Sequence, residues 1–264
     1  MLTKENYFKL NNGFLTNSKI GDFLQCHEYF YKKHITGEIV EKKTSALNVG
    51  KVVDELLTCD EISQKYFVAG DRRTKEGKAE AQKKIEEGYE IVSEKDYNDM
   101  FALASAVEKT TAFKQLKNFT KQEIIAVKMD LGEHFQGIAG IPDFYKISSA
   151  TKKCTIVDLK TSQVIEPYLY HKHCEKYGYY RQMAMYSILL KAKYPEITYF
   201  EYYHLVVDKT KNINHVRTFQ LANADVNDQI EYLESCFKAV KNTKNFKKYD
   251  PTFEDAVMIG SNCF

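Results

Sequence analysis

Three charged residues in the segment 140–160 have types and spacing that suit metal-dependent chemistry on a phosphate. The segment reads G-I-P-D-F-Y-K-I-S-S-A-T-K-K-C-T-I-V-D-L-K and contains Asp143, Asp158 and Lys160. Side chains alternate across a strand, so Asp158 and Lys160 point to the same face if this stretch is extended. Carboxylate oxygens suit Mg²⁺, which keeps waters and a substrate phosphate as its other ligands. If Asp143 lies beside them, the lysine can orient or help deprotonate a water and offset phosphate charge.

An aspartate-x-lysine triplet alone does not establish a site of this kind. The same triplet arises by chance in many proteins, usually at a solvated strand end where the two charges form an incidental ion pair. The surrounding elements and the other motifs of the chain decide between the two interpretations.

The elements that would position the three residues are predicted to be strands. The stretch Ile138–Ile147 is rich in Ile, Phe and Tyr, Cys154–Leu159 is apolar and β-branched, and residues 148–153 between them are polar. This pattern is typical of two neighbouring strands joined by a turn. Ile197–Asp208 is a further β-prone stretch, and His215–Leu221 is its predicted hairpin partner, with the turn around Lys211 and Asn212. The predicted strands are Glu123–Leu131, Phe135–Ile147 and Cys154–Leu159, which we expect to form an antiparallel meander, followed by Ile197–Asp208 and His215–Leu221.

Apolar residues at helical spacing predict helices before, between and after these strands in the sequence. Ser93, with Asp96 three residues later, resembles a capping pair at the start of one helix. In the longest predicted helix, Gln182 and Tyr186 are four residues apart and therefore lie one above the other. The predicted helices are Ser18–Lys33, Ala46–Cys59, Ala79–Glu87, Ser93–Lys117, Tyr168–Lys193 and Ala224–Lys241.

A polar, basic loop is predicted between the second and third of these helices. The stretch 67–78 reads F-V-A-G-D-R-R-T-K-E-G-K. It is either a solvated turn or a segment that contacts phosphates through Arg72, Arg73, Lys75 and Lys78.

The composition is that of an ordinary globular chain, with 264 residues, 44% of them hydrophobic and 28% charged. This length predicts one domain, with a core at about 45–220, a helical N-terminal segment at 1–44, and a C-terminal helix and tail at 221–264. Because the formal net charge is +2, a nucleic-acid surface would have to be a local basic patch.

The cysteines and the apolar runs indicate the setting of the protein. No two cysteines form a C-x-x-C pair, so the usual zinc and iron–sulfur spacings are missing. The N-terminus has no apolar run, and no stretch approaches the roughly 18 apolar residues of a membrane span, so we expect neither a signal peptide nor a membrane association. We therefore expect a cytoplasmic protein with free thiols. The cysteines are Cys26, Cys59, Cys154, Cys174, Cys236 and Cys263.

Four motifs, taken in order, resemble the PD-(D/E)-x-K nuclease superfamily. They are G-K-V-V-D-E-L-L in a helix, G-I-P-D-F, V-D-L-K-T-S, and a helix with Y-G-Y-Y-R-Q-M-A-M-Y. The last is similar to the Q-x-x-x-Y motif of the branch that includes RecB-type nuclease domains. With G-D-R-R-T-K-E-G-K, it most resembles the RecE-like exonucleases of phages and prophages. The likeness implies an α/β (α+β) fold with a restriction-endonuclease-like core, in which helices flank a central mixed β-sheet.

The resemblance implies a role for each residue that matches a motif. Asp143 and Asp158 match the metal ligands, Lys160 matches the lysine, and the Leu159 carbonyl is expected to complete the metal shell. The Q-x-x-x-Y pair, Gln182 and Tyr186, is expected to support the site and contact DNA.

Three further residues are implied at or near the site. Glu123 resembles an acidic residue found upstream of the P-D motif, and Thr161, directly after the motif lysine, joins the expected DNA-binding residues. Relatives often carry a His four residues after the glycine of the first helix motif, whereas here Asp54 follows Gly50. Aspartate is a competent Mg²⁺ ligand, so this difference implies either one more carboxylate at the metal or a changed metal preference or activity. The iron–sulfur version of the branch needs a cysteine cluster that this chain lacks, so we expect no cluster.

The resemblance implies a Mg²⁺-dependent deoxyribonuclease, with Mn²⁺ as a substitute metal. We expect a 5′–3′ exonuclease that acts on duplex DNA ends in recombination of the phage or prophage type. Partners implied by the family are a single-strand annealing protein and further copies of the chain in a ring. Two alternatives stay open, namely a nuclease-fold protein that binds DNA without cutting it, and a structure-specific endonuclease of the same fold.

Overall fold

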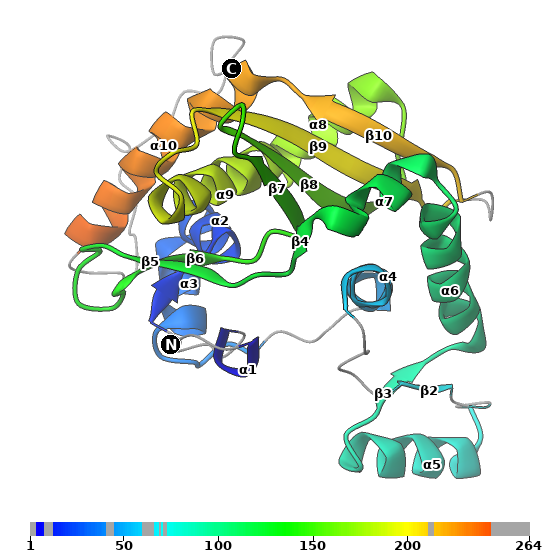
Figure 1. The fold of residues 1–264 in the computed structure, drawn as a ribbon. Helices are drawn as coiled ribbons and strands as arrows, with labels where there is room; N and C mark the ends of the chain where they lie inside the picture. Colours follow the sequence, from blue (N-terminus) through cyan, green and yellow to red (C-terminus); the bar gives the residue numbers. More distant parts are fainter. Residues whose placement is uncertain are drawn as a thin grey trace.

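The computed structural model describes most of the chain, from the short helix α1 (Lys4–Tyr7) to the end of the C-terminal helix (Figure 1). Four residues named above lie outside the described part, namely Arg72, Lys211, Asn212 and Cys263. The described residues are 4–7, 13–40, 45–59, 66–68, 70, 73–210 and 214–243.

A five-stranded mixed sheet forms the centre of the fold, with strand order β10-β9-β8-β7-β4. The long central strands β8 and β9 pair in parallel, and the other neighbours pair antiparallel. This sheet confirms the prediction of a central mixed β-sheet in a restriction-endonuclease-like core. The bounds are β4 Thr120–Lys121, β7 Phe144–Ser148, β8 Lys153–Ser162, β9 Tyr199–Asp208 and β10 Val216–Leu221.

Helices cover both faces of this sheet, so its central strands are apolar on both sides. One face packs on α8, α9 and α10, and the opposite face packs on α4 and α6 (Figure 1). Side chains along β8 alternate between the two sides, with Ile156 in the cluster under α9 and Val157 in the cluster under α4 and α6. The bounds are α4 Ser45–Thr58, α6 Glu94–Glu108, α8 Pro167–Lys176, α9 Tyr179–Lys193 and α10 Asn223–Asn242.

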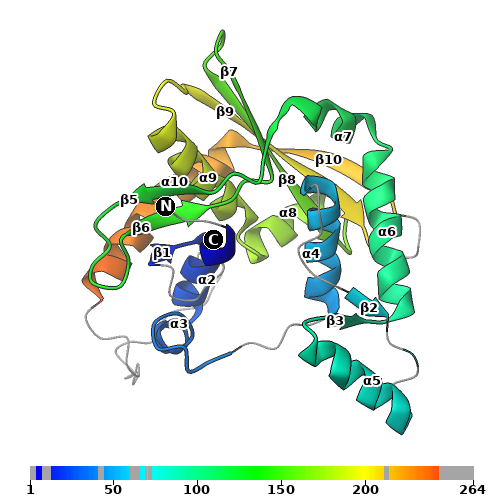
Figure 2. The same ribbon diagram turned by 60° about the horizontal axis from the view of Figure 1, so that its bottom comes forward.

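Two smaller sheets flank the central one. In the first, β1 pairs in parallel with β6, and β6 pairs antiparallel with β5. In the second, β2 and β3 pair in parallel beside α5, beyond the ends of α4 and α6 (Figure 2). The bounds are β1 Phe14–Leu15, β5 Ile125–Lys128, β6 Gly137–Gly140, β2 Tyr66–Val68, β3 Glu90–Val92 and α5 Lys75–Glu86.

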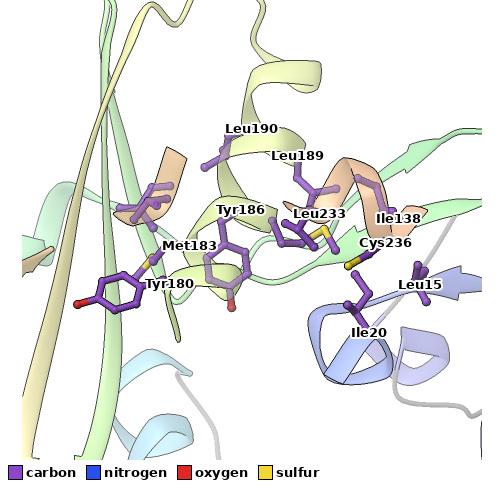
Figure 3. Packing of buried hydrophobic residues seen from close by; sticks show 14 of the residues in the cluster. Leu15, Ile20, Ile138, Tyr180, Met183, Tyr186, Leu189, Leu190, Leu233 and Cys236 are labelled. Carbon is purple, nitrogen blue, oxygen red and sulfur yellow. The ribbon is translucent and has the colours of Figure 1, made fainter. Parts of the chain in front are cut away.

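The larger core cluster lies around α9. Tyr186, Leu189 and Leu190 of α9 pack with residues of α10, β6 and the N-terminal helix α2 (Asn17–Gln25), which places α9 between the two larger sheets (Figure 3). At Gly140 of β6, an added Cβ would lie 2.8 Å from the Leu189 Cδ1 atom and 3.2 Å from the Tyr186 ring, so the helix approaches this strand closely.

Two of the helices predicted from the sequence are each divided in two. The first is divided into α2 (Asn17–Gln25) and α3 (His27–His34) because Cys26 is extended and its sulfur accepts a bond from the Tyr29 amide. The longest is divided at Gly178, whose φ of +65° ends α8 before α9 begins.

The helix predicted from Ser93 to Lys117 is also divided. Thr110 accepts a bond from the Phe113 amide and starts the short helix α7 (Thr111–Gln115), which leads into the 3₁₀ turn Leu116–Asn118. The predicted cap at the first end is confirmed, since the Ser93 hydroxyl accepts a bond from the Asp96 amide.

The predicted antiparallel meander is wrong in one respect. β5 pairs with β6 and β7 pairs with β8, but β6 and β7 belong to different sheets. The chain leaves one sheet and enters the other through Ile141, Pro142 and Asp143, because proline lacks the amide proton that a continuous ladder would need.

Among the described residues, no helix combines the length and the apolar character needed to cross a membrane.

Candidate active site

Strand register brings the first two candidate carboxylates together. In the antiparallel pair β7–β8, Phe144 is opposite Val157, so the preceding residue Asp143 comes opposite Asp158. The Leu159 amide donates a 2.8 Å hydrogen bond to Oδ2 of Asp143 and fixes this carboxylate against β8. Lys160 forms an ion pair with Oδ2 of Asp158, which confirms that these two side chains lie on one face.

The same register extends across four strands. Gln122 follows β4, and its amide bonds to the Asp143 carbonyl at 3.1 Å, so the two residues are opposite each other. On the other side, Asp158 of β8 is paired with His204 of β9. Gln122, Asp143, Asp158 and His204 therefore form one row of polar residues across the sheet.

Burial makes this row electrostatically unusual. Asp158 is 1% exposed and Asp143 is 9% exposed. Oδ1 of Asp158 is buried and has no hydrogen-bond donor among the described residues. A buried carboxylate oxygen without a donor is costly in a folded protein, and such sites are usually completed by an ion or water.

The charges at the site perturb one another. Burial raises the pKa of Asp143 well above its ordinary value, and the nearby carboxylates of Asp54 and Asp158 raise it further. The Lys160 ammonium and the Leu159 amide oppose this shift. Burial alone would lower the pKa of Lys160, but the two carboxylates outweigh it and raise that pKa, which keeps the ammonium charged.

Gln122 is a site residue that the sequence analysis missed. Its side-chain amide donates to Oδ1 of Asp143 at 2.9 Å and to Oδ2 of Asp54 at 3.4 Å, so it links carboxylates from two different elements. Its φ of +47° turns the backbone sharply at the end of β4. A lone glutamine between two short strands carries no sequence signal for this role, since the same pattern is common in solvated turns.

Asp54 reaches the site from α4, on the other face of the sheet. The helix approaches β8 at Gly50, where an added Cβ would lie 3.1 Å from the Thr161 hydroxyl oxygen. One helical turn later, Asp54 lies beside Leu159, Lys160 and Thr161 around a cavity of about 20 Å³. Glycine at position 50 therefore allows the approach that brings Asp54 within reach of Gln122.

The glutamine–tyrosine pair of α9 is also at the site. The Gln182 amide donates a 2.8 Å hydrogen bond to the Tyr186 hydroxyl. Burial raises the pKa of Tyr186, and the charges of Asp158 and Asp143 raise it further, so the phenol lies within the field of both carboxylates. Tyr186 is 6% exposed and lies between α9 and β6 (Figure 3).

A buried histidine closes the row behind the lysine. His204 is fully buried, and its Nδ1 atom is 2.9 Å from the Tyr170 hydroxyl. Burial lowers the pKa of His204, and the Lys160 ammonium lowers it further, so the imidazole is neutral at neutral pH. Lys160 therefore provides the positive charge at this end of the row.

The other predicted site residues do not join this group. Lys193 pairs with the Glu123 carboxylate at 2.5 Å, and the Tyr145 hydroxyl donates to it, so Glu123 is engaged elsewhere. Arg73, Lys75 and Lys78 are exposed at the start of α5, which lies beyond β2 and β3, away from β7 and β8 (Figure 2).

The donors present fit a divalent cation. Asp143 and Asp158 are opposed carboxylates, and the Leu159 carbonyl lies between Asp158 and Lys160 in the chain. In the described part of the chain, no three His, Cys, Asp or Glu side chains gather as a complete metal cluster, and Asp54 is linked to Asp143 through Gln122. A bound cation would coordinate the buried oxygen of Asp158 that lacks a donor, and its charge would offset the repulsion between the carboxylates.

Comparisons with known proteins identify the family and the fold of the chain. The profile of a family described as "PDDEXK-like domain of unknown function (DUF3799)" matches residues 16–254. The crystal structure of a "putative exonuclease" from Eubacterium rectale superposes with a TM-score of 0.62 at 17% identity, covering 92% of this chain and 87% of that chain.

Two further comparisons add no support. The crystal structure of SSO0001 covers 72% of this chain and 84% of its own at 14% identity, but its TM-score of 0.32 is too low to support an argument. No curated protein sequence matches the chain. Since the family profile spans nearly the whole chain, and the fold is that of the first neighbour, the protein belongs to the PDDEXK-like family DUF3799 and has the PD-(D/E)-x-K nuclease fold.

Proposed function

We propose that the protein is a metal-dependent deoxyribonuclease that hydrolyses phosphodiester bonds at the row formed by Asp143, Asp158 and Lys160. The observation that carries this proposal is the opposition of two buried carboxylates beside a charged lysine, with a buried oxygen of Asp158 still lacking a donor. Structural pairs of this kind normally satisfy every buried oxygen, so the arrangement favours a site that a cation completes.

Asp143, Asp158 and the Leu159 carbonyl would hold Mg²⁺, or Mn²⁺ in its place, with Asp54 as an additional carboxylate. A bound cation would polarise the phosphate and lower the pKa of a water that attacks it. Gln122 donates from its side-chain amide to both Asp143 and Asp54 and so holds these two carboxylates close to each other. The charged Lys160 ammonium offsets the charge of the phosphate.

The pair on α9 contributes substrate contacts in this proposal. Gln182 is half-buried and holds the Tyr186 hydroxyl beside the carboxylates, so both polar groups can contact the DNA strand near the scissile phosphate. Phosphates further along the DNA would be bound by polar and basic residues outside the carboxylate row. These are Thr161, Arg73, Lys75 and Lys78, together with Arg72, which lies outside the described residues.

The finer assignment is a 5′–3′ exonuclease that starts at duplex ends and works in recombination of the phage or prophage type. It rests on the motif resemblance to RecE-like enzymes and on the description of the Eubacterium rectale neighbour as an exonuclease. A single-strand annealing protein and a ring of copies of this chain are the partners that this assignment proposes.

Digestion of linear duplexes labelled at either the 5′ or the 3′ end tests the proposal. We expect the 5′ label to be released first. Release should require Mg²⁺ or Mn²⁺, and no label should be released in EDTA. Lys160→Ala should abolish release, whereas Lys153→Ala, seven residues earlier on the same strand and paired with Glu201, should not. Cleavage in EDTA, or cleavage unaffected by Lys160→Ala, would refute the metal-dependent mechanism. Cleavage of a covalently closed circular duplex, which has no ends, would show that the protein is an endonuclease and would refute the exonuclease assignment.

A further inference from the structure

An exposed aromatic side chain lies at the junction between α8 and α9, next to the candidate active site. The side chain of Tyr177 is 51% exposed. Its ring stacks on Tyr179, with ring centroids 5.8 Å apart and planes 30° from parallel. Tyr179 is half-buried, and the Lys160 ammonium lies 4.8 Å from the centre of its ring. Two successive contacts therefore lead from the exposed Tyr177 ring to the lysine of the site.

The turn between the helices fixes this arrangement. Gly178 separates the two tyrosines and adopts φ +65°, a conformation that other residues rarely adopt. An added Cβ at Gly178 would lie 2.7 Å from an Arg181 guanidinium nitrogen. The sharp turn places Tyr177 and Tyr179 side by side, although residues two apart on a helix would point in different directions.

Positive and polar groups border the exposed ring. The Lys176 ammonium is 5.4 Å from the centre of the Tyr177 ring, and the His173 ring meets it edge-on at 5.4 Å. Lys176 is exposed and carried on a flexible stem, so it can leave the ring face and remain near a bound phosphate. A flat aromatic surface with a cation at its edge is complementary to a nucleotide, whose base stacks while its phosphate pairs with the cation.

We propose that Tyr177 stacks on an unpaired base of the DNA end and so holds the nucleotide that adjoins the scissile phosphate. This inference deepens the proposed nuclease function and rests on it for the identity of the ligand. The Tyr177–Tyr179 stack would then set the distance between the unpaired base and the Lys160 ammonium. A paired base inside a duplex cannot use this surface, because both its faces are already stacked on neighbouring base pairs.

The test uses a duplex with 2-aminopurine at an unpaired terminal position, titrated with the full-length protein in EDTA and low salt, where cleavage cannot occur. Stacking on Tyr177 should quench 2-aminopurine emission. Tyr177→Ala should abolish the quenching and weaken binding about tenfold, within the range for loss of one aromatic–base stack. Tyr177→Phe should keep both, since the ring is retained.

Tyr199→Ala is the matched control. Tyr199 is 49% exposed, but on β9 it is paired with Lys153, seven residues and therefore roughly 23 Å from the position of Lys160. We expect this variant to bind and quench as the wild type does. A Tyr177→Ala variant that binds and quenches like the wild type would overturn the proposal, as would equal quenching of a 2-aminopurine placed at a paired, interior position.

The outcomes separate this proposal from the nuclease assignment. Quenching that depends on Tyr177, without cleavage when Mg²⁺ is restored, would support the stacking surface and refute the nuclease. Metal-dependent cleavage without Tyr177-dependent quenching would refute the stacking surface and support the nuclease. Absence of DNA binding by the wild-type protein would refute both.

Discussion

Replacement of Gln122 by glutamate should destabilise the metal-free protein and at the same time increase its stabilisation by Mg²⁺. The substitution keeps the shape of the side chain but replaces the amide donor by a carboxylate oxygen. In the wild type that donor lies 2.9 Å from Oδ1 of Asp143 and 3.4 Å from Oδ2 of Asp54. Both hydrogen bonds would become contacts between like charges.

The magnitude follows from these two distances. With an effective dielectric constant of about 20, each contact would cost roughly 5 kcal/mol if all three carboxylates stayed charged and in place. The side chain will rotate away instead, which limits the cost to the lost hydrogen bonds, about 1.5–3 kcal/mol for one with a charged partner. The 3.4 Å bond is long and adds little. We therefore expect a loss of about 2 kcal/mol for Gln122→Ala, and about 3–4 kcal/mol for Gln122→Glu, which adds residual repulsion.

Urea denaturation in EDTA, and again in Mg²⁺, measures both effects. We expect Mg²⁺ to stabilise Gln122→Glu by more than it stabilises the wild type, because the added carboxylate faces a cation. Gln163→Glu is a control with the same chemical change on an exposed side chain, for which a change within about 0.5 kcal/mol is expected. The reasoning fails if Gln122→Glu equals the wild type in EDTA, or if Mg²⁺ stabilises both equally.

Three further predictions concern other parts of the chain. Lys160→Met should abolish cleavage and lower the unfolding free energy in EDTA by about 3–5 kcal/mol, since Asp158, 1% exposed, loses its cation; unchanged stability in urea denaturation would contradict this. Gly140→Ala should lower DNA cleavage, because its Cβ meets Leu189 at 2.8 Å and Tyr186 at 3.2 Å, whereas Gly70→Ala meets nothing within 4 Å and should leave activity unchanged. Burial lowers the pKa of Lys19 from 10.5 to about 8, so between these pH values the unfolded chain binds more protons than the folded protein does. The contribution of Lys19 to the unfolding free energy should therefore rise by about 3 kcal/mol from pH 8 to pH 10.5. Urea denaturation of the wild type and of Lys19→Met at both pH values measures this contribution, and the rise should be absent from the variant.

The sequence predicted the strands best where each is long and apolar. β8 and β9 lie within one or two residues of the predicted Ile, Val and Tyr-rich stretches at most ends, because burial on both faces requires continuous apolar sequence. The common face of Asp158 and Lys160 followed from the period of two along a strand. The opposition of Asp143 and Asp158 required the register of β7 on β8, which apolar pattern alone does not specify.

The breaks in the chain were harder to predict. Cys26 and Thr110 divide helices through caps formed by a sulfur and a hydroxyl, and neither residue interrupts an apolar pattern. Gly178 was a visible signal, since glycine commonly ends a helix in the left-handed conformation. The separation of β6 from β7 was signalled by Pro142, but the sheet that each strand joins is set by tertiary packing.

The candidate site was predicted where a motif names a residue, and missed where only geometry does. Gln122 depends on the register of the short strand β4 and on a left-handed backbone, so nothing in its neighbours distinguishes it from a turn residue. His204 lies in an apolar strand, where a histidine is usually a core residue. Glu123, next to Gln122 in the chain, pairs with Lys193 and does not join the site, because the left-handed turn at Gln122 sends the two neighbouring side chains in different directions.

Calorimetric titration of the metal-free protein with Mn²⁺ tests the central claim most directly, because it measures the cation at the carboxylate pair without DNA or turnover. We predict saturable binding to the wild type, and loss of that binding in both Asp143→Asn and Asp158→Asn, with Asp130→Asn, an exposed aspartate paired with Lys241, unchanged. Binding of Mn²⁺ to Asp143→Asn and Asp158→Asn with wild-type affinity would contradict the account.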